Sequence, residues 1–224
     1  MMTAQLEILI EGAPAPPANA TPIVAIAISI FALLFTLGSF WWMNVRKGTI
    51  SALPSTTFSG YMAERGIGLR VQILLHNSGA REQVVRALRL VGRDSRGITY
   101  YLENQTFRKS IMPQKADTED FAHGFSIAGR TTASKFVHFS TKVLPQLEPG
   151  ATAKFQVQAM LGRSADWQDL GEIEIHLGIV TGSYIGWSSN PGHWNSDTRE
   201  NGFKYQRELM EKAYPKAASA TSQE

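Results

Sequence analysis

Two groups of acidic and histidine side chains could supply metal ligands. Glu172, Glu174 and His176 occupy alternate positions, so on a strand they would share one face. A second group consists of Asp117, Glu119, Asp120 and His123. We interpret the first group as a solvated strand face, because no second cluster completes a coordination shell. We interpret the second as a solvated loop, because it lacks the alternating Asp/Asn–Gly pattern of a calcium-binding loop. Neither group therefore predicts a metal site.

Patterns for nucleophilic and cofactor chemistry are also missing. The stretch nearest to a nucleophile elbow, Gly124-Phe-Ser126-Ile-Ala128, lacks the second glycine. The sequence has no phosphate-binding loop, no dinucleotide-binding fingerprint and no cysteine. The absence of cysteine excludes disulfides, thiolate metal sites and cysteine nucleophiles. We therefore expect a protein that is not an enzyme and carries no cofactor.

A long apolar run is the most informative feature of the chain. Residues 23–43 are 21 consecutive positions without a charged side chain. As a helix this run spans roughly 30 Å, the thickness of the hydrocarbon core of a bilayer. A core helix is rarely apolar on all sides over six turns. A signal peptide would begin with basic residues, and none precedes this run. The sequence predicts an N-terminal tail over 1–22 and a transmembrane helix over 23–45.

The flanking charges predict the orientation of that helix. Only two glutamates precede it, whereas Arg46 and Lys47 follow it directly. Basic flanks stay on the cytoplasmic side. We therefore expect a single-pass protein of the inner (plasma) membrane, with its N-terminus outside and its C-terminal domain cytoplasmic. Trp41 and Trp42, together with Arg46 and Lys47, are predicted to anchor the helix at the membrane interface.

Small and hydroxylated residues form a stripe along the predicted helix. They recur at spacings of four, three, four and three: Ala25, Ser29, Ala32, Thr36 and Ser39. Small residues let helix backbones approach closely in lipid, and hydroxyl groups can hydrogen-bond between helices. The stripe predicts packing against another transmembrane helix. The alternative is a solitary anchor in which small residues coincide by chance.

Apolar and polar residues alternate with period two after the helix. The pattern is clearest in residues 69–76, 153–161 and 172–179. Less regular strand candidates are residues 49–58, 84–91, 98–103, 121–127 and 135–140. Turn residues separate these segments. The sequence predicts an all-β domain over residues 46–180, a seven- to eight-stranded antiparallel sandwich.

Three features of this region occur in an order known from other domains. A strand ends in Leu74-Leu-His-Asn77-Ser-Gly79, an apolar strand follows at 84–91, and Leu147-Glu-Pro-Gly150 leads into an alternating strand. In these features, over roughly residues 50–180, the chain resembles immunoglobulin-like sandwiches of the CARDB and fibronectin III type. The resemblance implies the fold. A role in adhesion or interaction would follow from it by analogy only.

Residues 181–214 combine an aromatic loop with a short helix. Tyr184, Trp187 and Trp194 lie in a segment rich in turn residues. They are candidates for contact with a partner or for a lid on the end of the sandwich itself.

The Asn195-Ser-Asp-Thr stretch predicts the cap of a helix over residues 199–214, with Glu200 completing a capping box. The expected apolar side of this helix consists of Phe203, Leu209, Met210, Ala213 and Tyr214. Residues 215–224 are predicted to be a disordered tail.

Two classes of function fit these predictions. The first is a non-catalytic accessory or scaffolding subunit of a larger integral-membrane complex, for example a photosynthetic or respiratory one. Its partners would be integral-membrane subunits and the lipid bilayer. In plan it would be similar to the H subunit of photosynthetic reaction centres. The second is an independent membrane-anchored immunoglobulin-like binding or adhesion module on the extracytoplasmic side. A net charge of +3 without a long basic run predicts no binding to nucleic acid.

Overall fold

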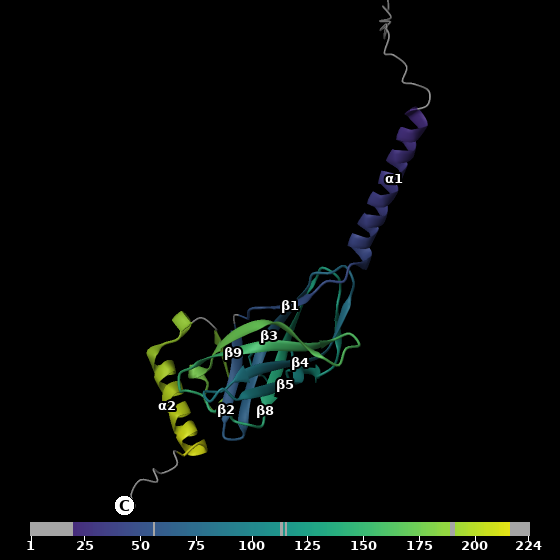
Figure 1. Ribbon diagram of the computed structural model, residues 1–224. Coiled ribbons are helices and arrows are strands. Elements are labelled where there is room, and N and C mark those ends of the chain that lie inside the picture. Colours follow the sequence, from purple (N-terminus) through teal and green to yellow (C-terminus); the bar gives the residue numbers. More distant parts are fainter. Residues whose placement is uncertain (1–19, 56, 113, 115, 189–190, 216–224) are drawn as a thin grey trace, which may run out of the picture. The chain divides into compact units, whose positions relative to one another are not determined.

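The computed structural model describes residues 20–55, 57–112, 114, 116–188 and 191–215. Contacts within the chain divide it after Arg46 into an N-terminal helical unit and a β-domain that begins at Lys47 (Figure 1). The two tails expected over residues 1–22 and 215–224 lie outside the described residues, apart from residues 20–22 and 215.

The N-terminal unit is one apolar helix. α1 spans Ala20–Phe40 and continues into a π-helical turn over Trp41–Val45. It begins before Pro22, because the first turn of a helix has backbone N–H groups without intrahelical acceptors, and proline is tolerated there. Residues 22–45 are long and apolar enough to cross a membrane, and none of this segment is buried within the chain. A signal sequence near the N-terminus meets the same description.

The β-domain is built on one continuous antiparallel sheet. Its described strands are β1 (Ile50–Leu53), β2 (Thr57–Ala63), β3 (Gly66–Asn77), β4 (Gln83–Arg93), β5 (Thr99–Arg108), β6 (Thr118–Phe121), β7 (Phe125–Ile127), β8 (Thr132–Thr141), β9 (Thr152–Leu161), β10 (Trp167–His176) and β11 (Ile185–Ser188). The main path runs in the order β10-β9-β4-β5-β8-β3-β2-β11, and β1, β6 and β7 pair off this path with β3, β5 and β4. β1 also lies beside β10. The sheet therefore curls, so that its edge strand β10 lies next to β1, which pairs with β3. Figure 1 labels β1 and β3.

The prediction of an antiparallel all-β domain between two helical elements is confirmed. The main path has eight strands, and the short additional strands arise where expected segments divide. Residues 49–58 divide at Pro54, which has no N–H to donate to a neighbouring strand, and form β1 and part of β2. Leu177–Ile179 form a 3-10 turn instead of extending β10. β11 comes from the segment expected to be a loop.

One hydrophobic core lies on the inner face of the sheet, as the alternation predicts. Six apolar side chains at alternate positions of the expected strands 69–76, 153–161 and 172–179 have exposed fractions of 0–2%: Val71, Ile73, Phe155, Val157, Ile173 and Ile175. Ile173 lies opposite Phe155 across β9 and β10, and Val71 lies opposite Val137 across β3 and β8. The period-two pattern therefore assigned the correct side chains to the inner face.

The C-terminal helix α2 (Ser196–Ala213) begins earlier than the sequence suggested. Asn195 is its N-cap, and the Asn195 side-chain oxygen accepts a hydrogen bond from the backbone N–H of Thr198 at 2.7 Å. Thr198 thus occupies the third helical position, where a capping box needs Glu or Gln. The predicted box with Glu200 is wrong for this reason. Leu209 and Met210 are buried as expected.

Candidate functional site

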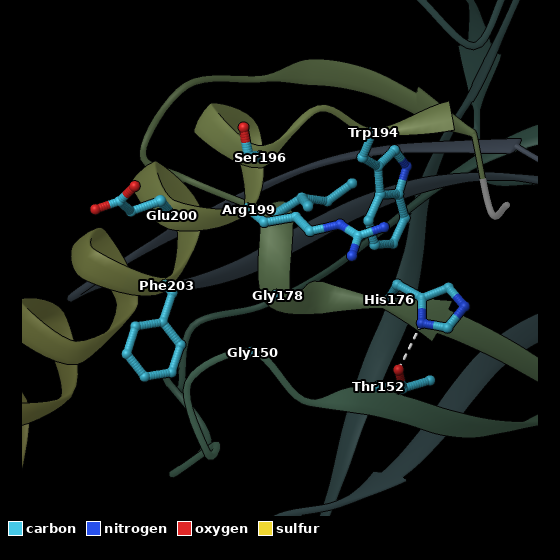
Figure 2. Close-up of a pocket in the computed structure, with 10 residues that line it drawn as sticks. Gly150, Thr152, His176, Gly178, Trp194, Ser196, Arg199, Glu200 and Phe203 are labelled. Carbon is cyan, nitrogen blue, oxygen red and sulfur yellow. Dashed lines mark hydrogen bonds between the residues drawn. The ribbon is translucent and has the colours of Figure 1, made fainter. Parts of the chain in front are cut away.

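A pocket of about 880 Å³ lies between the N-terminal half of α2 and the end of the sheet where β9 begins and β10 stops (Figure 2). Its lining residues come from these three elements and the turns beside them: Gly150, Thr152, His176, Gly178, Ile179, Trp194, Ser196, Arg199, Glu200 and Phe203. Residues from distant parts of the sequence converge here. This is the arrangement by which proteins commonly form ligand sites.

The wall formed by α2 is held in place by a buried glutamine. Gln206 is 2% exposed, and its side-chain amide donates to the carbonyl oxygens of Leu177 and Val180 and accepts from the N–H of Gly150. Gly202 lets the helix come close, because a Cβ atom there would lie 2.4 Å from the carbonyl oxygen of Gly178. The pocket is therefore bounded by a fixed helix rather than by a loop.

The polar groups of the pocket surround one indole ring. Trp194 donates from Nε1 to the carbonyl oxygen of Ser188 at 3.0 Å. Its ring meets the ring of His176 edge-on, with 5.2 Å between centroids, and the guanidinium carbon of Arg199 lies 5.7 Å from the indole centroid (Figure 2). His176 in turn forms a hydrogen bond with the hydroxyl of Thr152. The hydroxyl of Thr152 and the ring of Trp194 together hold the imidazole of His176 in place.

The far wall of the pocket is apolar and open to solvent. The Phe203 ring, expected on the buried side of α2, is 46% exposed and lies across the pocket from Trp194 (Figure 2). The side of α2 that faces the sheet carries Gly202 and Gln206, which are buried, and not Phe203. Two aromatic rings with a few polar groups between them suit the binding of an apolar or aromatic group that carries one polar atom.

The fold does not bring the first group of possible metal ligands together into one site. Glu172 and Glu174 are exposed on β10, as expected, and Glu172 forms an ion pair with Lys154 at 3.6 Å. His176 is half-buried and belongs to the pocket instead. Among the described residues, no group of three or more His, Asp or Glu side chains could hold a metal ion.

A buried ionic cluster corrects the interpretation of the second group. Asp117 is 6% exposed, and its carboxylate is paired with Arg70, which is 4% exposed, and with Arg108 at 3.0 Å. The guanidinium of Arg70 also donates to the carbonyl oxygens of Ser110 and Met112. Ser110, Met112 and Asp117 thus lie over the outer face of β3 and cover Arg70. Asp117 is therefore not part of a solvated loop, although Glu119, Asp120 and His123 are exposed.

The electrostatics of this cluster follow from its burial and its two guanidinium groups. Burial alone would raise the pKa of Asp117, but hydrogen bonds and charge from Arg70 and Arg108 outweigh it and lower the pKa below its usual value. Burial lowers the pKa of His138 to about 4, and the charges of Arg108 and Arg70 act in the same direction. His138 is therefore neutral at pH 7, beside Arg70 in the strand register.

Two of the three aromatic partner candidates, Tyr184 and Trp194, have different surroundings. Tyr184 packs on its own domain, with its ring 5.7 Å from that of His138 and 5.4 Å from the Arg70 guanidinium carbon. Trp194 lies in the pocket beside α2. Trp187 lies in β11 opposite Phe58, and its side chain is outside the described part of the structure. The contacts of Tyr184 are with polar-face residues of β3 and β8, and its role as a partner contact stays a prediction.

The predicted membrane-helix residues occupy the positions expected on α1. The hydroxyl of Ser29 donates to the carbonyl oxygen of Ala25 at 2.8 Å, and that of Thr36 donates to Ala32 at 2.7 Å. These hydroxyls therefore bond within their own helix. The stripe ends at Ser39, and beyond it the guanidinium carbon of Arg46 lies 4.1 Å from the centroid of the Trp42 ring.

No protein-family model matches the chain, and no curated protein matches it at a significant level. The assignment of function therefore depends on the geometry of the chain itself.

Proposed function

We propose that the protein is a non-catalytic, single-pass membrane protein that serves as an accessory or scaffolding subunit of a larger integral-membrane complex. In this proposal α1 is a retained anchor, its N-terminus lies outside, and the β-domain lies in the cytoplasm. Integral-membrane subunits and lipid are its partners.

The observation that carries the proposal is a shallow groove of about 310 Å³ on α1, lined by Ala25, Ile26, Ser29, Ile30 and Leu33. Small side chains form a depression between larger ones, which suits a ridge of a neighbouring helix. Because the Ser29 hydroxyl bonds back to Ala25, the groove can be filled by close packing without leaving that hydroxyl unpaired.

The end of α1 also supports this proposal. Trp41 and Trp42 are exposed, and Arg46 lies over the Trp42 ring. Trp and Arg side chains suit the headgroup region because each has an apolar part that can lie against lipid and a polar part that can reach water. Basic residues at this end favour the cytoplasmic side for the β-domain.

A second candidate function is an independent membrane-anchored immunoglobulin-like binding module on the extracytoplasmic side. The pocket beside α2 favours it, because Trp194 and Phe203 present aromatic surface in a fixed concave site. The occupant would be a partner polypeptide that inserts an apolar or aromatic side chain, since such anchors dominate protein interfaces.

Purification of the full-length protein in mild detergent, followed by identification of co-migrating proteins, tests the first proposal. Replacing Ala25, Ser29 and Ala32 together by Leu should release the partner subunits while the protein remains inserted. The matched control replaces Ala27 and Phe31 by Leu and Leu34 by Ile on the opposite side of α1, and it should retain them. Equal retention by both variants would refute a role for the groove.

Two further measurements separate the alternatives. If the partner is retained by both helix variants but lost on Phe203→Ser, the binding-module function replaces the subunit function. Extraction of membranes with alkaline carbonate tests the anchor itself. Release of the β-domain without α1 would identify residues 22–45 as a cleaved signal sequence and would overturn both candidates.

A further inference from the structure

We propose that the end of the β-domain that begins at Lys47 binds the headgroups of anionic phospholipids. This inference rests on the proposed function, since it requires α1 to be a retained membrane span. Val45 ends the apolar segment and Lys47 begins the β-domain. Two residues reach at most about 7 Å. Chain connectivity alone therefore keeps this end of the domain at the membrane interface.

A buried asparagine ties the loops at this end together. Asn77 is 0% exposed, and its side-chain amide donates to the carbonyl oxygens of Arg81, Ile127 and Ala128 at 2.8–3.2 Å. Its side-chain oxygen accepts from the N–H of Gly79 and from the side chain of Gln83. These bonds join the β3–β4 turn to the segment after β7. The loops thus form one fixed platform.

The beginning of the β-domain is part of the same platform. The side chain of Gln83 also donates to the carbonyl oxygen of Gly48 at 2.8 Å, and the N–H of Thr49 donates to the Ser78 hydroxyl at 3.0 Å. Gly48 and Gly79 touch so closely that a Cβ atom on Gly48 would lie 1.8 Å from the nitrogen of Gly79. Residues 47–49 are therefore held against the β3–β4 turn.

The platform displays an excess of positive charge. Its exposed basic side chains are Lys47, Arg81, Arg86, Arg130 and Arg163, and its exposed acidic side chains are Glu82 and Asp166. Arg86 also braces the β9–β10 turn by donating to the carbonyl oxygen of Ser164. The charges come from four separate segments, so a sequence scan for basic runs does not find them.

Three of these basic residues surround a depression large enough for a headgroup. Lys47, Arg81 and Arg163 line a pocket of about 730 Å³ together with Glu82, Gln83 and Gln168, so three basic side chains face one acidic side chain there. Guanidinium groups bind phosphate with paired N–H groups, and the side-chain amide of Gln168 can donate to a glycerol or phosphate oxygen. The amide of Gln83 already donates to Gly48 and Asn77, so it shapes the pocket rather than binding the headgroup. A basic pocket at the membrane interface fits an anionic phospholipid by both charge and position.

The size of the effect follows from the charge. Each basic side chain near an anionic surface changes the partition between surface and solution by about fivefold. Removing two of them should therefore reduce the preference for anionic over neutral lipid by about 25-fold. Screening by salt should reduce the preference in the unmodified protein as well.

The test uses the full-length protein in lipid nanodiscs of phosphatidylcholine, with and without phosphatidylglycerol. Arg81→Gln combined with Arg163→Gln removes two platform charges. Arg65→Gln combined with Lys204→Gln is the matched control, because Arg65 precedes β3 at the end opposite Asn77 and Lys204 lies on α2. We expect native mass spectrometry to show retained phosphatidylglycerol on the wild type and control and a large loss on the platform variant. Hydrogen exchange of residues 78–82 and 162–166 should slow when phosphatidylglycerol is present.

The outcomes separate this inference from the proposed function. If the protein stays in the disc but lipid retention and exchange are the same in both lipids, the platform does not bind headgroups and only this inference fails. If exchange slows only when co-purified proteins are added, the surface binds an acidic protein, and the inference is again overturned. If the protein leaves the disc, α1 is not a membrane anchor. The proposed function is then refuted, and this inference is refuted with it.

Discussion

Replacing Asp117 by Asn should destabilise the β-domain more than most surface substitutions could. The variant keeps the shape of the side chain but removes the negative charge that faces both Arg70 and Arg108. Arg70 is 4% exposed, so water cannot replace the lost carboxylate. Removing one partner of a buried ion pair costs about 3–5 kcal/mol, because it leaves an uncompensated buried charge. We expect a loss of unfolding free energy in that range at pH 7.

The pair between Glu119 and Lys135 provides a matched control. Glu119 lies in β6, close to Asp117 in the sequence, and Lys135 lies in β8. The distance from Lys135 Nζ to Glu119 Oε1 is 2.7 Å. The Glu119 side chain is 43% exposed, so Glu119→Gln should cost no more than about 1 kcal/mol. Urea unfolding of the full-length protein in a mild non-ionic detergent, monitored by circular dichroism, measures the loss of unfolding free energy in both variants. Equal losses for the two variants would refute the burial of Arg70 together with Asp117.

The pH dependence gives an independent check. The pKa of Asp117 is lowered from the ordinary value of 3.8, so its contribution to stability is present above that value and is lost as pH falls through the folded-state pKa. The difference in unfolding free energy between wild type and Asp117→Asn should therefore be constant at neutral pH and should shrink in acid. A difference that grows as pH falls would contradict the ion pairing.

Three other outcomes are expected. Phe155→Ala should cost about 3–5 kcal/mol in urea unfolding, because the ring is 0% exposed in the core, and a loss under about 1 kcal/mol would mean that the ring is not enclosed. Asn195→Ala should cost about 1 kcal/mol through loss of the N-cap of α2, whereas Asn195→Asp should cost little. Protease added to intact cells or spheroplasts should spare the β-domain, and digestion from outside would move it to the extracytoplasmic side.

The inner face of the sheet could be predicted from the sequence because one physical cause dominates there. Apolar side chains at alternate positions of a strand all gain by burial on the same side, and this pattern is local. Val71 and Ile73 on β3, and Ile173 and Ile175 on β10, follow it. The apolar helix before Arg46 is local in the same sense, since its composition alone determines where it begins and ends.

The ionic cluster could not be predicted because its partners are distant in the chain. Arg70 occupies a polar-face position of β3, where an arginine ordinarily meets water. Its counter-charge, Asp117, lies 47 residues later. Only the packing of Ser110, Met112 and Asp117 against β3 brings them together. The sequence gives no local signal for this pair, because Arg70 alternates with apolar residues just as Gln72 and His76 do.

The pocket beside α2 was missed for a related reason. Trp194 and the helix were both expected, but not the docking of the helix on the sheet. That docking depends on Gln206, which satisfies the carbonyl groups of the 3-10 turn after β10, and on Gly202, which permits close approach. A glutamine on a helix is usually solvated, so sequence alone assigns Gln206 to the wrong side. Phe203 then faces solvent as a consequence.

Strand β9 separates the two surfaces on which the functional proposals depend. Thr152, at its first residue, lines the pocket beside α2, and Leu161, at its last, lines the basic pocket near Lys47. Nine strand steps of about 3.3 Å place the pockets roughly 30 Å apart. The two pockets have no lining residue in common. Substitutions this far apart with no shared contacts should have additive effects on stability. If the pocket beside α2 binds a partner, as the second candidate function requires, Phe203→Ser should weaken that binding without changing lipid retention, and Arg81→Gln with Arg163→Gln should do the reverse. Coupling between the two would mean that the sheet transmits a change along its strands, which a rigid scaffold does not do.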